Sequence, residues 1–218
     1  MRIGFAGLAH SHPFTDAATA RAQGVEDVVA WSDDPTRLEA FRRDCDCLAV
    51  DSLPALLARR PDAVVATLRP AEVAGVVAAV LDAGVPCFAN KVVAATPAQL
   101  EALDKAVRGR EDRFFTASVL RFAPAVRALA AELESAVPVL ARAVVRHDIS
   151  MFLRPERRWQ DDPAVGGGTL VSVGLHGVEL LDAVLGEGVQ AAAAERAVRA
   201  VRDTRSEDAA ALLLRWPD

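Results

Sequence analysis

The sequence predicts an α/β fold in which a doubly wound parallel sheet comes first and an α+β domain with an open, mainly antiparallel sheet follows. Three observations predict this architecture. Apolar strand-like runs alternate with helical patterns through the first half of the chain. These runs are nearly continuous in apolar residues, as in parallel strands covered on both faces. The pattern changes near residue 118, so we place one domain at 1–118 and a second at 119–218.

The first domain has predicted strands at Arg2–Gly7, Asp27–Trp31, Asp62–Leu68, Val85–Asn90 and Arg113–Ser118. Two of the intervening helices have recognisable starts. Asp34 precedes Pro35 and Thr96 precedes Pro97, and each pair places a capping side chain before a proline at the first helical position. Gln99, three residues after Thr96, is positioned to complete a capping box.

The second domain mixes helices and strands. The sequence predicts a helix at Pro124–Leu133, a strand at 139–149, a polar loop, and a strongly apolar helix at about Thr169–Leu185. Two strand-like runs follow, near Val189–Arg199 and Asp208–Trp216. Because the last strand would lie at an open sheet edge, we expect this domain to be incomplete at its C-terminus or covered by a partner chain.

Composition excludes several classes of protein. The 218 residues are 52% hydrophobic and 25% charged, which predicts a folded chain rather than disorder. The net charge of −5 and the lack of a basic stripe argue against a nucleic-acid partner. The longest apolar stretch, Val73–Leu81, is too short to span a bilayer, and the N-terminus does not read as a signal peptide. Three cysteines without a paired framework favour a reducing compartment, so we expect a cytoplasmic protein.

The segment "GLAHSH" after the first strand stands where a dinucleotide-binding fold has a glycine-rich loop. Gly7 matches the first glycine of such a loop, while Ala9 and His12 replace the other two. A simple strand-to-helix turn with exposed histidines is the alternative. A metal site at His10 and His12 would need more ligands, and the chain has just two other histidines, so we expect no metal site.

Two further patterns place polar groups in apolar surroundings. Ser172, His176 and Glu179 lie at i, i+4 and i+7 of the apolar helix, so they share a face that should meet a cleft or buried partners. A histidine hydrogen-bonded within the core, or a stripe facing water, would explain the same pattern. Asn90 and Lys91 follow a predicted parallel strand, at the end that faces the ligand crevice. A partly desolvated lysine there would have a lowered pKa and exchange protons, although most lysines simply lie on the surface.

Four segments taken in order resemble the Gfo/Idh/MocA oxidoreductase family. They are "RIGFAG" at the first strand, the run from "DAVVATLRP" to "FANKVVAATPAQLEAL", "RFAP" at 121–124, and "RWQDDPAVGGGTLVSVGLHGVELLDAVLG". The likeness covers nearly the whole chain. It implies a Rossmann-type dinucleotide-binding domain at 1–118 and a substrate and oligomerisation domain at 119–218. Members are usually longer, which implies a C-terminally shortened second domain here.

The resemblance also implies a cofactor, NAD or NADP, and roles for particular residues. Catalytic roles fall on Lys91, His176 and Ser172. Substrate contacts fall on Lys91, Trp159, His176 and Glu179. Cofactor contacts fall on Gly7, Leu8, Ala9, His10, Ser32, Asp33, Thr67, Asn90 and Lys91. Of the two loop histidines, we expect His10 to be functional and His12 to be structural.

The chain also departs from the family pattern. Asn90 and Val92 replace the glutamate and proline around the lysine, Gln160 replaces an arginine, and Ser172 and Glu179 replace two aspartates. At the end of the second strand, Ser32 takes the place of the acidic residue that holds the adenine ribose. Asp33 beside it is a possible substitute, whereas a serine with Arg37 downstream would admit the 2′-phosphate of NADP.

Three functions follow as hypotheses. The first is an NAD(P)-dependent oxidoreductase acting on a hydroxyl-bearing carbon of a sugar, cyclitol or similar polyol, with Lys91 or His176 as the base. The second is a non-catalytic nucleotide- or sugar-binding relative, favoured by Ser172 and Asn90. The third is a metal-dependent lyase or hydrolase using His10, His12 and His176. We expect a small-molecule substrate, no nucleic acid, no membrane, and a possible homo-oligomer formed through the sheet of the second domain.

Overall fold

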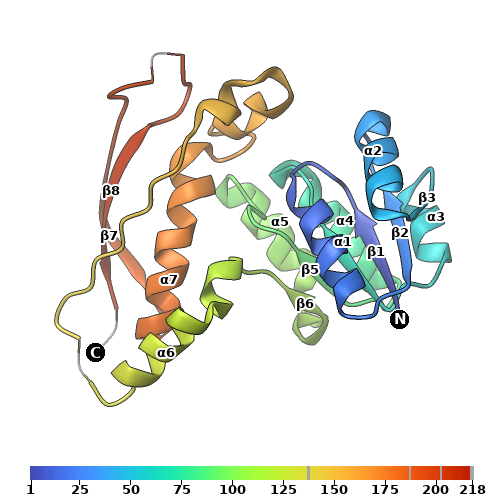
Figure 1. The fold of residues 1–218 in the computed structure, drawn as a ribbon. Helices are drawn as coiled ribbons and strands as arrows, with labels where there is room; N and C mark the ends of the chain where they lie inside the picture. Colours follow the sequence, from blue (N-terminus) through green and yellow to red (C-terminus); the bar gives the residue numbers. More distant parts are fainter. Residues whose placement is uncertain (137, 187, 202, 217–218) are drawn as a thin grey trace. The chain divides into compact units, whose positions relative to one another are not determined.

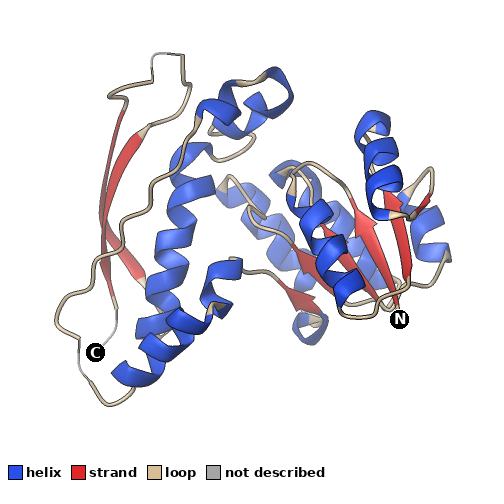
Figure 2. Ribbon diagram, in the orientation of Figure 1, coloured by secondary structure: helices blue, strands red, loops and turns tan. Residues whose placement is uncertain are grey.

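The computed structural model describes residues 1–136, 138–186, 188–201 and 203–216. The chain divides into two compact units, Met1–Thr116 and Ala117–Asp218. Figure 1 traces both units along the sequence, and Figure 2 separates their helices from their strands.

A six-stranded parallel sheet organises the first unit, in the order β3-β2-β1-β4-β5-β6. β1 pairs with β2 from Arg2–Asp27 to Ala6–Trp31 and with β4 from Ile3–Ala63 to Ala6–Ala66. The strands are β1 (Arg2–Ala6), β2 (Asp27–Trp31), β3 (Leu48–Ala49), β4 (Ala63–Ala66), β5 (Cys87–Ala89) and β6 (Phe114–Phe115). All five predicted strands are present, the later ones shorter than expected, and β3 is an addition that its two residues were too few to signal.

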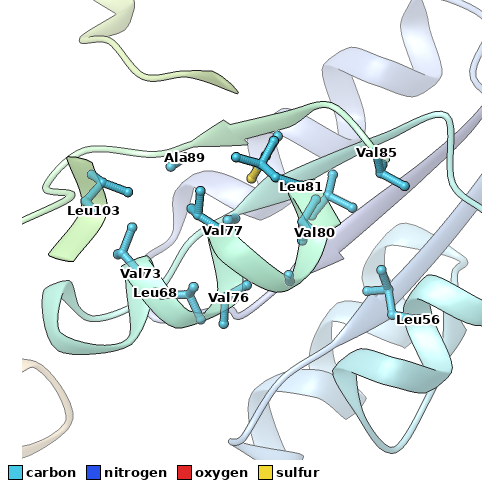
Figure 3. Packing of buried hydrophobic residues seen from close by; sticks show 14 of the residues in the cluster. Leu56, Leu68, Val73, Val76, Val77, Val80, Leu81, Val85, Ala89 and Leu103 are labelled. Atoms are coloured by element: carbon cyan, nitrogen blue, oxygen red, sulfur yellow. The ribbon is translucent and has the colours of Figure 1, made fainter. Parts of the chain in front are cut away.

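Two core clusters form on the two faces of this sheet because successive residues of a strand point in opposite directions. On one face Phe5, Val28 and Ala30 pack with residues of α1 (His12–Ala22) and α2 (Pro35–Cys45). On the other face Ala6 and Val29 pack with residues of α3 (Leu53–Ala58), α4 (Pro70–Asp82) and α5 (Pro97–Val107). Figure 3 shows the second cluster, where α4 supplies Val73, Val76, Val77, Val80 and Leu81. The continuous apolar runs of the strands therefore correspond to a sheet covered on both sides.

Helix caps set where these helices begin. The Asp34 side chain accepts a hydrogen bond from the Arg37 amide at 3.0 Å, and the Thr96 hydroxyl accepts one from the Gln99 amide at 3.3 Å, as predicted. The predicted capping box is wrong in one detail. Gln99 Oε1 accepts from the amide of Ala95 at 2.7 Å rather than from that of Thr96. The long glutamine side chain thus holds the residue before the cap.

The second unit contains α6 (Pro124–Leu133), α7 (Leu175–Leu185) and a two-stranded antiparallel ribbon of β7 (Gln190–Ala197) and β8 (Ala209–Arg215). The predicted helix over 169–185 begins with a π-helical turn at Leu170–Gly174 before α7 continues it. Within α7, Gly177 is buried and the other residues are half-buried.

The strand predicted at 139–149 is also wrong, because this extended stretch pairs with neither strand of the described ribbon. Val139 and Leu140 are almost fully exposed, and a strand needs a neighbour to pair with. Val145 lies close to α7 instead, since a Cβ built on Gly177 would come 3.0 Å from Val145 Cγ2. Within the described residues, no helix combines the length and apolar character needed to cross a membrane.

The turn between β1 and α1 is tightly constrained. Gly7 has φ +77°, and a Cβ built on it would lie 2.3 Å from Leu68 Cδ2 and 2.8 Å from the Thr67 carbonyl oxygen. The Gly7 amide donates to the Trp31 carbonyl at 2.8 Å, and the Ala9 amide donates to the Thr67 carbonyl at 3.0 Å. The turn is therefore fastened to the ends of both neighbouring strands, and it leaves no room for a side chain at residue 7.

Gly7→Ala should destabilise the protein by about 2–5 kcal/mol, the sum of left-handed backbone strain and overpacking. Gly75→Ala is the matched control, because a Cβ built on Gly75 in α4 meets no atom within 4 Å apart from its chain neighbours and the backbone of its own helix. The Gly75→Ala substitution should raise the free energy of unfolding by about 0.5–1 kcal/mol. Urea unfolding of the two variants measures both effects, and equal stabilities would contradict the constraint at Gly7.

Candidate functional site

Polar side chains gather in the first unit at the carboxyl ends of β1, β2, β4 and β5. His10, Ser32, Thr67 and Asn90 follow these strands, and each is at most 8% exposed. The chain leaves β1 and β4 toward opposite faces of the sheet, as the two core clusters require, so the strand order reverses between them. Ligands of open α/β sheets bind at such a switch point. Gly7–His10 and Thr67, where cofactor contacts are expected, lie at this point.

Arg37 holds the loop after β1 from the neighbouring helix. Its Nε donates to the Leu8 carbonyl at 2.5 Å, and its Nη2 donates to the His10 carbonyl at 2.6 Å. The interpretation of Arg37 as a receptor for a 2′-phosphate did not foresee this use. Two of its N–H groups bind the backbone of residues 8–10, which fixes the shape of the loop.

The two loop histidines differ in their surroundings. His10 is 8% exposed, whereas His12 is half-buried and is the first residue of α1. Their ring centroids lie 5.8 Å apart in an edge-on arrangement. His12 stands where a packing glycine was expected, and α1 begins there, so a bulky residue is accommodated at that position.

The end of β2 presents two carboxylates. Asp34 caps α2, as described above, and Asp33 lies with one carboxylate oxygen 3.8 Å from Arg69 Nη1. Ser32 Oγ accepts from the Asp34 amide at 3.2 Å. Arg69 also approaches Glu72, at 3.6 Å, so both nearby arginines already have anionic or carbonyl partners. Because the arginines at this strand end already have partners, the carboxylates there favour neutral hydroxyl groups, which donate hydrogen bonds, over a further anion.

The end of β5 carries Asn90 and Lys91, and the peptide bond after Lys91 is cis. Burial lowers the pKa of Lys91 below the ordinary lysine value of 10.5, as predicted. Asn90 Nδ2 donates to Asp16 Oδ2 at 3.4 Å, and burial raises the pKa of Asp16 above 3.8. Sequence reasoning missed Asp16, because an aspartate in the middle of a helix carries no signal of a contact 74 residues away.

In the second unit, His176 Nδ1 lies 2.6 Å from the hydroxyl of Ser118, a residue with no solvent exposure. Ser172 has a different partner, since its hydroxyl donates to the carbonyl of Gly168 at 2.6 Å. Glu179 Oε2 lies 4.0 Å from Arg121 Nη1, and Asp182 lies 3.8 Å from the same guanidinium. The three residues of the predicted helical stripe therefore contact three separate groups.

The glycines before this helix are required by packing. A Cβ on Gly166 would lie 2.3 Å from the Trp159 carbonyl oxygen, and one on Gly168 would lie 2.7 Å from Ser206 Cβ. Trp159 itself is half-buried, in the 3₁₀ segment Pro155–Asp161. The "GGG" segment thus lets the helix start pack against the Trp159 turn on one side and Ser206 on the other.

Asp161 joins these parts through a buried carboxylate, 1% exposed. It accepts hydrogen bonds from the Thr204 hydroxyl, the Ser206 hydroxyl at 2.8 Å, and the Arg205 and Ser206 amides at 2.8 and 3.2 Å. Burial opposes ionisation, but these hydrogen bonds outweigh it and hold the pKa of Asp161 below 3.8. Beside it, Glu207 accepts from the Leu170 amide at 2.5 Å, at the start of the helix that carries His176.

The cysteines belong to the cores of the first unit. Burial raises the pKa of Cys47 to about 11 and that of Cys87 to about 12, so neither thiol is ionised near neutral pH. Across the described ranges, no group of three or more histidine, cysteine, aspartate or glutamate side chains is arranged to hold a metal ion.

Asp161→Asn should destabilise the protein by about 2–3 kcal/mol at pH 7, because an amide nitrogen cannot accept the hydrogen bonds that both carboxylate oxygens receive. The loss should shrink as pH falls, because the lowered pKa contributes stability that is present above the unfolded value and lost as pH falls through the folded value. Urea unfolding at pH 7 and below pH 4 measures this. Asp203→Asn, an exposed change in the same loop, is the control and should have no effect.

Comparison with known proteins matches residues 1–118 to the Gfo/Idh/MocA family model, described as an oxidoreductase family with an NAD-binding Rossmann fold. A search of curated proteins found no match.

Solved structures share the fold at low identity. A proposed NADPH-dependent oxidoreductase from Desulfitobacterium hafniense has a TM-score of 0.83 and 19% identity, covering 98% of this chain and 63% of its own. The WlbA dehydrogenase from Bordetella pertussis, solved with NADH and UDP-GlcNAcA, has a TM-score of 0.78 and 20% identity over 99% and 66%. Scyllo-inositol dehydrogenase from Lactobacillus casei, solved with NAD(H) and scyllo-inositol, has a TM-score of 0.73 and 16% identity over 93% and 61%.

The chain thus spans less than two thirds of the length of these structures. The family match covers more than half of the chain and the whole predicted first domain. The chain therefore belongs to the Gfo/Idh/MocA family of oxidoreductases, with the NAD-binding Rossmann fold of that family in its first unit.

Proposed function

We propose that this chain is an NAD-dependent oxidoreductase that oxidises or reduces a hydroxyl-bearing carbon of a sugar, cyclitol or similar small polyol. The observation that carries the proposal is the set of buried polar side chains at four neighbouring strand ends around the β1–β4 switch point. The relatives solved with UDP-GlcNAcA and with scyllo-inositol support the substrate class.

The residues of the first unit fit a dinucleotide. Thr67 Oγ1 is buried at the end of β4 and has no hydrogen-bond partner in the described chain, as expected of a group that meets a ligand. Gly7, Leu8, Ala9 and His10 would hold the pyrophosphate at the start of α1, and Ser32 and Asp33 would hold the adenine ribose. Asn90 and Lys91 would meet the nicotinamide end. When bound, the nicotinamide accepts or donates the hydride.

Cofactor choice follows from the charges at the end of β2. Asp33 would accept hydrogen bonds from the ribose hydroxyls of NAD, while its charge would repel a 2′-phosphate. Arg37 is held in place by the Leu8 and His10 carbonyls, which accept from two of its N–H groups, so its position is set by the loop. We therefore propose NAD rather than NADP as the preferred cofactor.

Calorimetric titration should give a dissociation constant for NAD⁺ about tenfold or more below that for NADP⁺, a difference of about 1.4 kcal/mol. Asp33→Asn should weaken NAD⁺ binding and narrow the difference, because it removes the charge. Asp112→Asn, on an exposed side chain elsewhere in the first unit, should leave both constants unchanged. Tighter binding of NADP⁺ by the unmodified protein would contradict the preference, and no binding of any nicotinamide nucleotide would contradict the proposed function.

Lys91 is the candidate base. Oxidation of a hydroxyl requires that its proton leave, and a lysine whose pKa is lowered by burial is deprotonated more readily near neutral pH. We propose His176 as the other residue beside the reacting oxygen. The half-buried Trp159, together with Glu179, would contribute substrate contacts.

The lowered pKa of Lys91 can be measured without a substrate. The chain has two lysines, Lys91 and Lys105, so protein labelled with ¹³C-lysine gives two Cε signals. The signal that disappears in Lys91→Met should titrate below 10.5. In turn, Lys91→Met should lower turnover on a polyol by about a hundredfold or more, whereas Lys105→Met should not change it. A titration at or above 10.5 would remove Lys91 as a base at neutral pH.

A second function, a non-catalytic nucleotide- or sugar-binding protein, is favoured by one observation. The Ser172 hydroxyl, at the position of a family aspartate, donates to a backbone carbonyl and so has its proton engaged away from a substrate. Nucleotide binding with no hydride transfer on a panel of polyols would favour this function. No described group of ligands supports the third hypothesis, a metal-dependent hydrolase or lyase.

For partners, we propose a small-molecule substrate and a second copy of this chain. Almost every residue of β7 and β8 is exposed, including Leu213 at 63%, and Val198 just after β7 is 57% exposed. A two-stranded ribbon that exposes this much apolar surface is typical of an assembly surface. Light scattering of the protein in solution would report its mass.

A further inference from the structure

The contact between Ser118 and His176 bears on the protonation of the imidazole ring as well as on its position. Ser118 is completely buried, and its hydroxyl oxygen lies 2.6 Å from His176 Nδ1. The same oxygen accepts a hydrogen bond from the Leu120 amide at 3.4 Å. Both contacts lie within the second unit, so the local geometry stands on that unit alone.

The protons at this contact can be assigned. A hydroxyl has one proton to donate and two lone pairs that accept. The Leu120 amide is a donor, so it occupies a lone pair and cannot take the hydroxyl proton. Among the described residues, His176 Nδ1 is the one acceptor hydrogen-bonded to Ser118 Oγ. Since a buried hydroxyl without an acceptor is costly, the proton points to Nδ1.

Ser172, the other serine near His176, donates its hydroxyl proton to a different acceptor. Ser172 lies one helical turn before His176, at the position of a family aspartate, and its hydroxyl donates to the Gly168 carbonyl at 2.6 Å. An aspartate at that position would only accept hydrogen bonds, whereas Ser118 donates one. The histidine of this chain is therefore held by a donor from the segment before α6.

We propose that Ser118 is a positioning residue that holds neutral His176 in the tautomer with its proton on Nε2. With Nδ1 accepting from Ser118, the second ring nitrogen of the neutral imidazole carries the proton. Nε2–H is then a donor to the carbonyl or hydroxyl oxygen of the substrate, and it is not a base. The hydroxyl proton released in oxidation goes to Lys91. This inference rests on the proposed function, which places His176 beside the substrate.

The tautomer is visible by NMR in the resting protein. Protein labelled with ¹⁵N-histidine has four imidazoles, and the signals lost in His176→Gln identify those of His176. In long-range ¹H–¹⁵N spectra above the histidine titration range, Nε2 of His176 should be protonated and Nδ1 unprotonated. Ser118→Ala should shift the signals toward a mixture of tautomers, and Ser118→Thr, which keeps a hydroxyl, should restore them. Ser172→Ala is the matched control and should leave the tautomer unchanged.

Two results would overturn the proposal: a proton on Nδ1 of His176 in the unmodified protein, or the same tautomer after Ser118→Ala. The unmodified protein alone gives the first result, so a variant that fails to fold does not prevent a decision. NAD⁺ titrated into the same sample separates the two claims. Absence of nucleotide binding counts against the proposed function, while the tautomer decides the role of Ser118.

Discussion

The close approach of the β1–α1 turn to the end of β4 is the constraint on which the candidate site depends. A side chain at residue 7 would overlap Leu68 and the Thr67 carbonyl, and the backbone there is left-handed. The turn is bonded to both adjacent strands, and Arg37 holds the next carbonyls from α2. Because these contacts leave the loop little freedom, its amides and the neighbouring strand ends have the fixed geometry that the proposed nucleotide site requires.

In the second unit, the start of the helix that bears His176 is also held in place, but by polar contacts. This unit has no large described sheet, so polar contacts organise the start of the helix that bears His176. Asp161 gathers the Thr204–Ser206 loop, Ser206 packs at Gly168, and Glu207 accepts from the first turn. Buried hydrogen-bonded carboxylates are sensitive to the loss of one partner, which ties this helix end to its loop. The "GGG" motif is thereby explained as packing, independently of chemistry.

The sequence predicted what repeats along the chain and missed what depends on distant contacts. Continuous apolar runs identified all five main strands, and capping chemistry located α2 and α5. The run at 139–149 misled because alternation indicates a strand without showing a neighbour to pair with. Arg37 clamping the loop, Asp16 beside Asn90, and Ser118 beside His176 join residues that are 27 to 74 positions apart. No local pattern encodes such contacts, because they exist only once the sheet and helices are assembled.

The central claim is that a nicotinamide dinucleotide binds along the carboxyl ends of β1, β2, β4 and β5. The most direct measurement is an NMR titration of ¹⁵N-labelled protein with NAD⁺, followed at each backbone amide. The largest shifts should occur at residues 7–10, 32–33, 67–68 and 90–91, with small shifts at the opposite ends of the same strands. Shifts confined to other surfaces, or no shifts at saturating nucleotide, would contradict the central claim.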